Sequence, residues 1–234
     1  MFERIEVMGQ GRVGSAVSAR LRERGIAVAG DAPELVLLCV PDTAIPDVAR
    51  GLTLRHDLGG HVWIGHVSGA TPLAALEPHV RRFGMHPLQT FARPEARSRA
   101  ELAAQLDGAW AAITGESEEA LAVAAWVAET LGLRPFELAD DARPLYHAGA
   151  AFASNYLVTL ARAAASLFDA AGAPPEALAP LMHRTIENGF ELTGPIARGD
   201  WKTVQRHRDA IRAARPELEH LYETLASATV AIAL

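Results

Sequence analysis

The sequence predicts an α/β domain with a doubly wound parallel sheet over residues 1–139, followed by an all-α domain over residues 140–234. In the first part, short apolar runs alternate with helical patterns, which is typical of strands connected by helices across a sheet. From about Ala139 onwards only helical periodicity remains. Half of the 234 residues are apolar, so a chain of this size can bury a substantial core.

Apolar runs in the first part predict its strands. The runs are Ile5–Met8, Ile26–Ala29, Leu35–Val40, His61–Ile64, Phe83–Met85, Ala109–Ile113 and Pro135–Leu138. The third run has six consecutive apolar residues, as a parallel strand that is buried on both faces requires. One helix is expected over Arg12–Arg24 and ends at Gly25, and another begins after Ser117 and ends at Gly132.

Helical periodicity in the second part predicts four helices. They cover about Arg143–Ala171, Pro175–Gly189, Trp201–Ala214 and Pro216–Ala233. Pro144 is compatible with the first turn of the first helix, where its missing N–H is not needed. Residues 192–200, between the second and third helices, are rich in turn residues and form a link.

A glycine motif follows the first strand and opens the first helix. Gly9 permits a tight turn, Gly11 lets the backbone approach a phosphate, and Gly14 lets helix and strand pack closely. The free N–H groups at the helix start favour an anion there. The alternative is an ordinary glycine turn, but the strand–turn–helix context favours a dinucleotide. The candidate cofactor residues of this motif are Gly9, Gln10, Gly11, Arg12, Val13 and Gly14.

Polar residues follow three of the predicted strands, where ligands of an open α/β sheet bind. Val40, Pro41 and Asp42 end the third strand and are expected beside the cofactor, although Asp42 could simply cap the next helix. Ser68 lies in the segment 66–70 after the next strand, and His86 in the segment 85–91 after the one beyond. Each histidine alone is more often structural than catalytic. Histidines at successive strand ends raise the odds of a function to about even.

The first helix of the second part carries His147 and Asn155. Ala151 lies between them at a spacing of four, so all three share a broad face over roughly 12 Å of helix axis. The two polar side chains are either satisfied core groups or part of a cleft between the domains. We favour the cleft, with His147 as proton donor and Asn155 orienting the substrate.

The link at residues 192–200 contains Thr193 and Arg198, which are candidate substrate-binding residues. Arg198 is its only cation and is suited to a bidentate contact with a carboxylate or phosphate. Equally, Arg198 and Asp200 could brace the helical domain by pairing with neighbouring elements.

Charge and cysteine content limit the classes of partner. A net charge of −6 argues against nucleic acid or an anionic membrane as the main partner. The single cysteine, Cys39, lies in an apolar run and reads as an inert buried thiol. The chain starts with no signal peptide and has no membrane-spanning run, so we expect a cytoplasmic protein. No metal is expected, because metal-ligand spacing is absent from the remaining histidines: His56, His61, His79, His183, His207 and His220.

Taken in order, these motifs resemble a bacterial family that pairs a Rossmann-like N-terminal domain with a helical C-terminal domain of unknown function. The resemblance rests on the glycine motif, the segments 40–42, 68–70 and 86–91, Tyr146-His147 with Asn155, and the segments 193–195 and 198–200. The family belongs to the 6-phosphogluconate dehydrogenase-like superfamily, alongside pyrroline-5-carboxylate reductase. The resemblance implies NAD or NADP as cofactor, hydride transfer in the interdomain cleft, and a homodimer formed through the helical domain.

Two departures from the superfamily pattern bear on activity. Its β-hydroxyacid dehydrogenases place a catalytic lysine one turn before an asparagine; if Asn155 is that asparagine, the lysine position holds Ala151. We hypothesise that His147, one turn further back, replaces the lysine. The second departure is the link Gly30–Glu34, which is too short for the usual helix after the second strand. Asp31 is placed to bind the adenosine ribose and would favour NAD over NADP.

The leading hypothesis is an NAD(P)-dependent oxidoreductase that acts on a small anionic metabolite. A second is a non-catalytic nucleotide-binding or dimeric interaction protein, supported by the missing lysine and the shortened adenosine side. A third, less favoured, is a methyltransferase that uses S-adenosylmethionine. Fold analogy alone does not select the substrate.

Overall fold

The computed structural model describes residues 2–55 and 58–233, which form two compact units divided between Ala151 and Phe152. The prediction placed the domain boundary at residue 139. In the structure, residues 140–151 group with the first unit because two of their side chains bond to it: Asp140 accepts from the amide of Leu73, and Arg143 donates to the carbonyl of Ser68.

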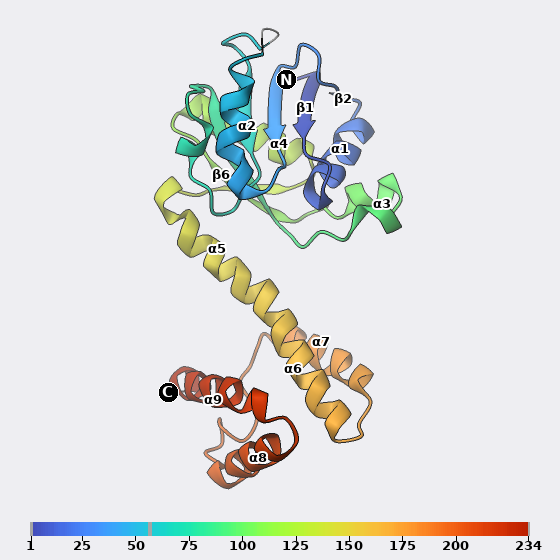
Figure 1. Ribbon diagram of the computed structural model, residues 1–234, viewed down its shortest axis with the longest axis vertical. Helices are drawn as coiled ribbons and strands as arrows, with labels where there is room; N and C mark the ends of the chain where they lie inside the picture. The colour runs from blue at the N-terminus through green and yellow to red at the C-terminus, as the bar shows by residue number, and fades with distance from the viewer. Residues whose placement is uncertain (1, 56–57, 234) are drawn as a thin grey trace. The chain divides into compact units, whose positions relative to one another are not determined.

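The first unit is built on a seven-stranded sheet, which confirms the predicted doubly wound α/β fold (Figure 1). The strands are β1 (Arg4–Met8), β2 (Ala27–Val28), β3 (Leu35–Leu38), β4 (Trp63–His66), β5 (Arg82–Leu88), β6 (Trp110–Thr114) and β7 (Arg134–Glu137). Their order is β2-β1-β3-β4-β5-β6-β7, and β1 to β5 are parallel. The order reverses between β1 and β3, so ligands are expected outside the carboxyl ends of these strands.

The sheet is mostly parallel, as predicted, and departs from the parallel arrangement at one edge. β6 pairs antiparallel to β5, and β7 follows β6 in parallel. The connection from β5 to β6 contains α3 (Arg99–Ala104), which packs beside α1 (Arg12–Glu23) rather than crossing the sheet. Arg20 of α1 fixes this position by donating to the carbonyl of Ala103 at 2.8 Å. Because no crossover occurs, the chain returns in the opposite direction.

Helices cover both faces of the sheet, with α1 and α4 (Glu118–Thr130) on one face and α2 (Ile45–Leu52) on the other (Figure 1). β3 shows the alternation that a strand buried on both faces requires. Leu35 and Leu37 pack in the cluster with α1 and α4, whereas Val36 and Leu38 pack in the cluster with α2.

Local signals account for the helix boundaries. The hydroxyl of Ser117 accepts the amide of Ala120 at 3.1 Å and caps α4, and Gly132 follows that helix with a φ of 85°. Gly25 has a φ of 78° just after α1. The link between β2 and β3 contains no helix, as its length predicted.

The second unit is helical, as predicted. Its helices are α6 (Leu157–Ala170), α7 (Leu178–Glu187), α8 (Trp201–Ala214) and α9 (Glu219–Ala233). The predicted bounds of α8 agree with the structure. The long helix expected over about Arg143–Ala171 is confirmed, and it runs without a break through α5 (Arg143–Ala151), a π-helical segment (Phe152–Tyr156) and α6. Such π segments occur frequently at functional sites.

Candidate cofactor site and histidine cluster

The glycine loop between β1 and α1 is closed at two of its glycines and open at the third. Gly9 has a φ of 99°, and a Cβ added there would overlap the backbone carbonyl of Cys39, just after β3. A Cβ on Gly14 would overlap the carbonyl of Gly9, and Val13 beside it packs against the core. A Cβ on Gly11 would meet nothing within 4 Å. The loop therefore leaves space beside Gly11, at the start of α1.

The start of α1 is suited to an anion. Gly11 is the N-cap, no side chain caps the helix, and the first turn contains the exposed Arg12 and no acid. The side chain of Gln10 turns back to the carbonyl of Val7 (3.3 Å) and the hydroxyl of Ser18 (3.4 Å), so it braces the loop. The first N–H groups of a helix lack partners within it and lie at the positive end of its dipole. These residues therefore fit the pyrophosphate of a dinucleotide.

The turn after β3 lies beside this loop. Val40 and Pro41 lead into a 3-10 turn that begins at Asp42. α2 begins after Ala44 and has no side-chain cap, so the structure gives Asp42 no capping role there. The carboxylate of Asp42 instead raises the pKa of His86, against larger opposing effects, which places it near the histidines described below.

The predicted adenosine side of the site would lie at the short link between β2 and β3. Arg55 donates to the carbonyl of Gly30 and to the carboxylate of Glu6, each at 2.6 Å. Arg4 donates to the backbone carbonyl of Asp31 at 3.3 Å. The side chain of Asp31 is exposed, and its contact with a ribose stays a prediction.

β4 and β5 place two histidines on one face of the sheet. His66 ends β4 and pairs with Gly84 of β5, and His86 lies two residues beyond Gly84. Residues two apart on a strand point to the same face. His66 is fully buried, and its Nδ1 accepts the amide N–H of Ser68 at 3.3 Å. The expected proximity of these two strand-end segments is confirmed.

Arg143, at the start of α5, is the charged centre of this cluster, and sequence reasoning missed it. Its side chain is fully buried, its Nη1 donates to the carbonyl of Ser68 at 2.7 Å, and its Nε lies 3.2 Å from Asp140. A Cβ on Gly84 would overlap its Nη2, which has no hydrogen-bond partner among the described residues. An arginine in the first turn of a helix is typical of a surface, so the sequence offered no signal of burial.

His86 meets α5 through two consecutive residues. Its Nδ1 lies 2.8 Å from the hydroxyl of Tyr146. Its ring packs edge-to-face on Tyr146 and His147, with centroids 5.6 and 5.7 Å apart. A Cβ on Gly69 would lie 2.9 Å from Nε2 of His86 and 2.5 Å from Nδ1 of His147. Atoms of both rings, Cε1 of His86 among them, therefore pack into the same corner of the backbone at Gly69, where a side chain would have no room.

Ser68 lies beside the cluster, but its hydroxyl is engaged locally. It accepts the amides of Ala70 (3.2 Å) and Thr71 (3.0 Å) and donates to the hydroxyl of Thr71 at 2.8 Å. The hydroxyl thus closes the turn after β4, while the Ser68 carbonyl holds Arg143. A catalytic role for the hydroxyl stays a prediction.

Burial and positive charge keep these imidazoles neutral. Burial, with Arg143 and His86 adding to it, lowers the pKa of His66 to about 3. Burial, followed by His147 and Arg143, lowers the pKa of His86 to about 4, with Asp42 opposing. At neutral pH both rings therefore act as hydrogen-bonding groups rather than as imidazolium acids.

The remaining predicted site residues belong to the second unit. Asn155 lies in the π-helical segment with its side chain exposed, and its Oδ1 accepts from the hydroxyl of Ser154 at 3.5 Å. Thr193 and Arg198 are also exposed. Asp200 caps α8 by accepting the amide of Thr203 at 3.1 Å. The roles of Asn155, Thr193 and Arg198 toward a substrate stay predictions.

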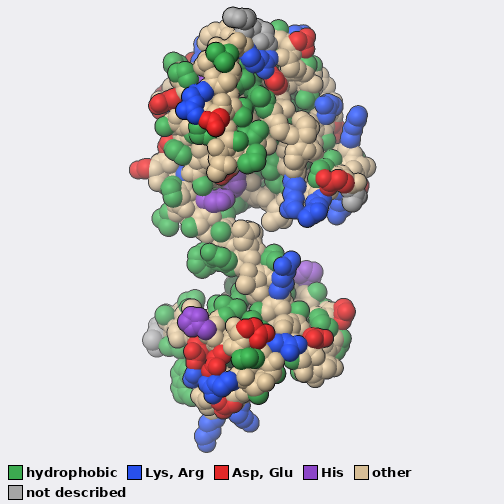
Figure 2. Space-filling view, viewed as in Figure 1, with side chains coloured by type: hydrophobic (Ala, Val, Ile, Leu, Met, Phe, Trp, Pro, Cys, Tyr) green, Lys and Arg blue, Asp and Glu red, His purple; other side chains and the backbone are tan. Residues whose placement is uncertain are grey.

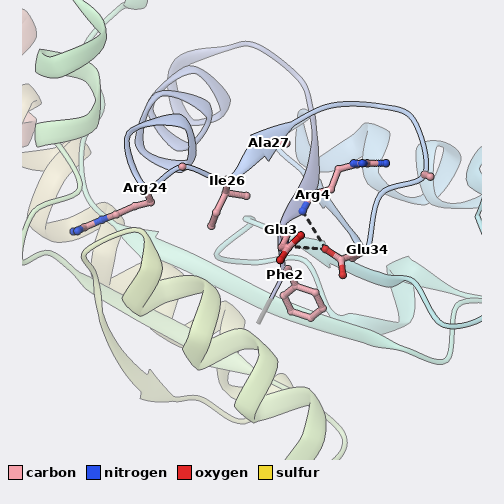
Figure 3. Close-up of a pocket in the computed structure, with 9 residues that line it drawn as sticks. Phe2, Glu3, Arg4, Arg24, Ile26, Ala27 and Glu34 are labelled. Carbon is pink, nitrogen blue, oxygen red and sulfur yellow. Dashed lines mark hydrogen bonds between the residues drawn. The ribbon is translucent and has the colours of Figure 1, made fainter.

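A separate hollow lies at the amino ends of the strands, opposite the glycine loop (Figure 3). There the carboxylate of Glu34 accepts the amides of Glu3 (2.6 Å) and Arg4 (3.0 Å). These bonds occupy the carboxylate within the fold, so we assign this hollow no role in the chemistry. Within residues 2–55 and 58–233, no group of three or more His, Cys, Asp or Glu side chains is arranged to hold a metal. His56 lies outside the described residues.

The first unit thus has a Rossmann-like fold whose glycine loop fits a dinucleotide, and a helical unit follows it. The chain belongs to the family described as Domain of unknown function (DUF2520), whose model matches residues 109–229. The membership indicated by the sequence motifs is therefore confirmed. None of the curated proteins matches the sequence.

Solved structures of low sequence identity share this fold. A proposed NADP oxidoreductase from Bacteroides fragilis is 20% identical, with a TM-score of 0.80 over 98% of both chains. A protein from Thermotoga maritima is 21% identical, with a TM-score of 0.73 over 98% of this chain and 97% of its own. A reductive aminase from Aspergillus terreus, solved with NADPH and ethyl levulinate, is 17% identical, with a TM-score of 0.65 over 98% of this chain and 94% of its own. At such identities the likeness establishes the fold. No helix among the described residues is both long and apolar enough to span a bilayer.

Proposed function

We propose that the protein is an NAD(P)-dependent oxidoreductase that acts on a small anionic metabolite. The observation that carries this proposal is the glycine loop, in which Gly9 and Gly14 are closed by backbone contacts while Gly11 faces open space at an uncapped helix start. The histidine cluster supports it, because His66 ends β4 and His86 lies near the carboxyl end of β5, and substrates of this fold bind at that edge. The oxidoreductases among the structural neighbours support the same class.

In this proposal the chain positions the reactants and handles a proton. The segment 9–14 would hold the pyrophosphate, and Val40, Pro41 and Asp42 would lie near the nicotinamide. A bound nicotinamide would supply or accept the hydride. His147 would give up or take the proton, in place of the lysine that this chain lacks at Ala151. Asn155 would orient the substrate, and Arg198 would bind its anionic group.

Calorimetric titration with NADH, NADPH and S-adenosylmethionine tests the cofactor assignment. The wild-type protein is expected to bind a reduced nicotinamide. Gly11→Asp is expected to fold normally, since the new side chain enters open space, and to lose at least about tenfold in affinity because it crowds and repels the phosphates. Gly51→Asp is the matched control: Gly51 also has nothing within 4 Å and lies in α2. Absence of nicotinamide binding, or preferential binding of S-adenosylmethionine, would contradict the proposal.

Turnover separates an enzyme from a non-catalytic binding protein. A panel of 2-hydroxy acids, keto acids and imino acids, assayed with the cofactor that binds, is expected to contain a substrate. His147→Ala should then abolish turnover and leave cofactor affinity unchanged. Firm cofactor binding without turnover on the whole panel would favour the non-catalytic alternative, and unchanged turnover in the variant would exclude His147 as the proton donor.

We also propose a homodimer formed through the helical unit. Among the described residues of this unit the buried apolar side chains are few, namely Leu178, Val204 and Ile211, whereas Phe190 and Ile232 are 71% and 78% exposed. Apolar side chains are visible between charged ones on its surface (Figure 2). Exposed apolar side chains that outnumber the buried ones favour an interface with a second copy.

A further inference from the structure

Tyr146 has a contact that the proposed reaction does not use. It lies on α5 immediately before His147, and its ring is half-buried against His86 and Phe136, with centroid separations of 5.6 and 6.0 Å. Its hydroxyl lies 2.8 Å from Nδ1 of His86. Burial raises the pKa of Tyr146 to about 12, so the hydroxyl keeps its proton at neutral pH.

The direction of this hydrogen bond follows from the available partners. Within the described part of the chain, the hydroxyl of Tyr146 has Nδ1 of His86 as its hydrogen-bond partner and no other acceptor. A half-buried hydroxyl is best satisfied when it donates. If it donates, Nδ1 of His86 is the acceptor, and the proton of the neutral ring must be on Nε2.

Nε2 and Cε1 of His86 both lie at the backbone corner beside Gly69, each 2.9 Å from where a Cβ on Gly69 would be. The same corner is faced by Nδ1 of His147, which is buried and has no hydrogen-bond partner among the described residues. Edge-to-face contacts with Tyr146 and His147 hold the ring of His86 from two sides. Nε2 of His86 and Nδ1 of His147 therefore lie close together, and the described protein groups leave Nδ1 of His147 without a hydrogen-bond partner.

We propose that Tyr146 is a positioning residue: its hydroxyl donates to Nδ1 of His86, fixes the Nε2–H form of that ring, and directs this N–H, together with His147, at an oxygen atom of the substrate. The identity of the oxygen as part of a substrate rests on the proposed function. A neutral N–H donor suits a carbonyl or carboxylate oxygen, which accepts a hydrogen bond without taking the proton. The buried guanidinium of Arg143 nearby also favours such an electron-rich group.

Long-range ¹H–¹⁵N NMR of the imidazole rings tests the positioning role without any turnover. In the wild-type protein His86 is expected in the Nε2–H form. Tyr146→Phe keeps the ring but removes the donor, and loss of one hydrogen bond should lower the ratio of the Nε2–H to the Nδ1–H form about fivefold. Tyr222→Phe is a matched control, because its hydroxyl lies 3.0 Å from Nδ1 of His207 in the second unit. That variant should change His207 and leave His86 unchanged.

Titration with acetone and with sodium acetate, at constant ionic strength, tests the oxygen site and separates a carbonyl from a carboxylate. One of the two is expected to shift the resonances of both His86 and His147 in the wild-type protein, and to shift them less in Tyr146→Phe. If neither compound shifts the resonances of His86 and His147, the proposed oxygen site is overturned.

A dominant Nδ1–H form of His86 in the wild-type protein would overturn the positioning role, and this result needs no variant. An equal ratio of the two forms in wild-type and Tyr146→Phe would overturn it too. Tyr146→Phe is expected to keep wild-type calorimetric affinity for the reduced nicotinamide. If wild-type protein binds no nicotinamide while Tyr146 still fixes His86, the oxidoreductase proposal fails and the positioning role stands.

Discussion

Acidification is expected to destabilise the first unit because His66 is buried in its neutral form. The pKa of His66 is about 3 in the folded protein and 6.5 in the unfolded chain. Between these values the unfolded chain binds a proton that the folded protein does not, so the free energy of unfolding falls as the pH is lowered. Well below pH 6.5 one such group contributes a slope of about 1.4 kcal/mol per pH unit, and its total contribution between pH 6.5 and about 4.5 is about 2 kcal/mol. His86, with a pKa of about 4, acts in the same direction.

Urea unfolding between pH 7 and about 4.5, followed by tryptophan fluorescence, measures this slope. Three of the four tryptophans lie in the first unit: Trp63, Trp110 and Trp126. His66→Asn keeps an acceptor for the amide of Ser68 but does not titrate in this range. At pH 7 the free energy of unfolding of this variant is expected to be lower than that of the wild-type protein. Below pH 6 it is expected to fall less steeply with pH than in the wild-type protein, by about 1.4 kcal/mol per pH unit. The carboxylates titrate alike in the wild-type protein and in His66→Asn, so they do not contribute to the difference. If the free energy of unfolding had the same pH dependence in both, the assignment of a neutral buried His66 would be refuted.

Three further predictions concern the cluster and the assembly. Gly69→Ala should displace His86 and His147, because the new Cβ enters the space that both rings occupy. The imidazole resonances should shift, and the free energy of urea unfolding should fall by about 1–3 kcal/mol. Unchanged resonances would contradict this geometry. Arg143→Met removes the cation beside Asp140 and the donor to the Ser68 carbonyl, and should lower the free energy of urea unfolding by about 1–3 kcal/mol. The same variant should raise the pKa of His86 in an NMR titration, and a lowered pKa would contradict this assignment. Sedimentation equilibrium is expected to show a dimer, and a monomer at all concentrations would exclude the helical interface.

Local chemistry made most elements of this fold predictable. Some features depend only on residues that are close in the chain, so the local sequence is enough to predict them. They are the glycine loop, the helix caps at Ser117 and Gly132, and the helical periodicity of α8. The direction of β6 was not predictable in this way. An apolar strand looks the same in either direction, and its orientation follows from α3 packing beside α1, which is a contact between distant segments.

In the candidate site, too, some features were predictable from the local sequence and others were not. The sequence by itself determined the glycine loop and indicated that His66 and His86 lie close together, because each comes at or after an apolar run and the two runs are consecutive along the chain. The structure extends β5 to Leu88, so His86 lies within that strand rather than after it. Only the tertiary structure decided that Arg143 is buried over Gly84, and that Gly69 brings the nitrogens of His86 and His147 to one corner. Burial depends on which distant surfaces meet, and a missing Cβ acts through space, so neither could be inferred from the residues that surround each position in the chain.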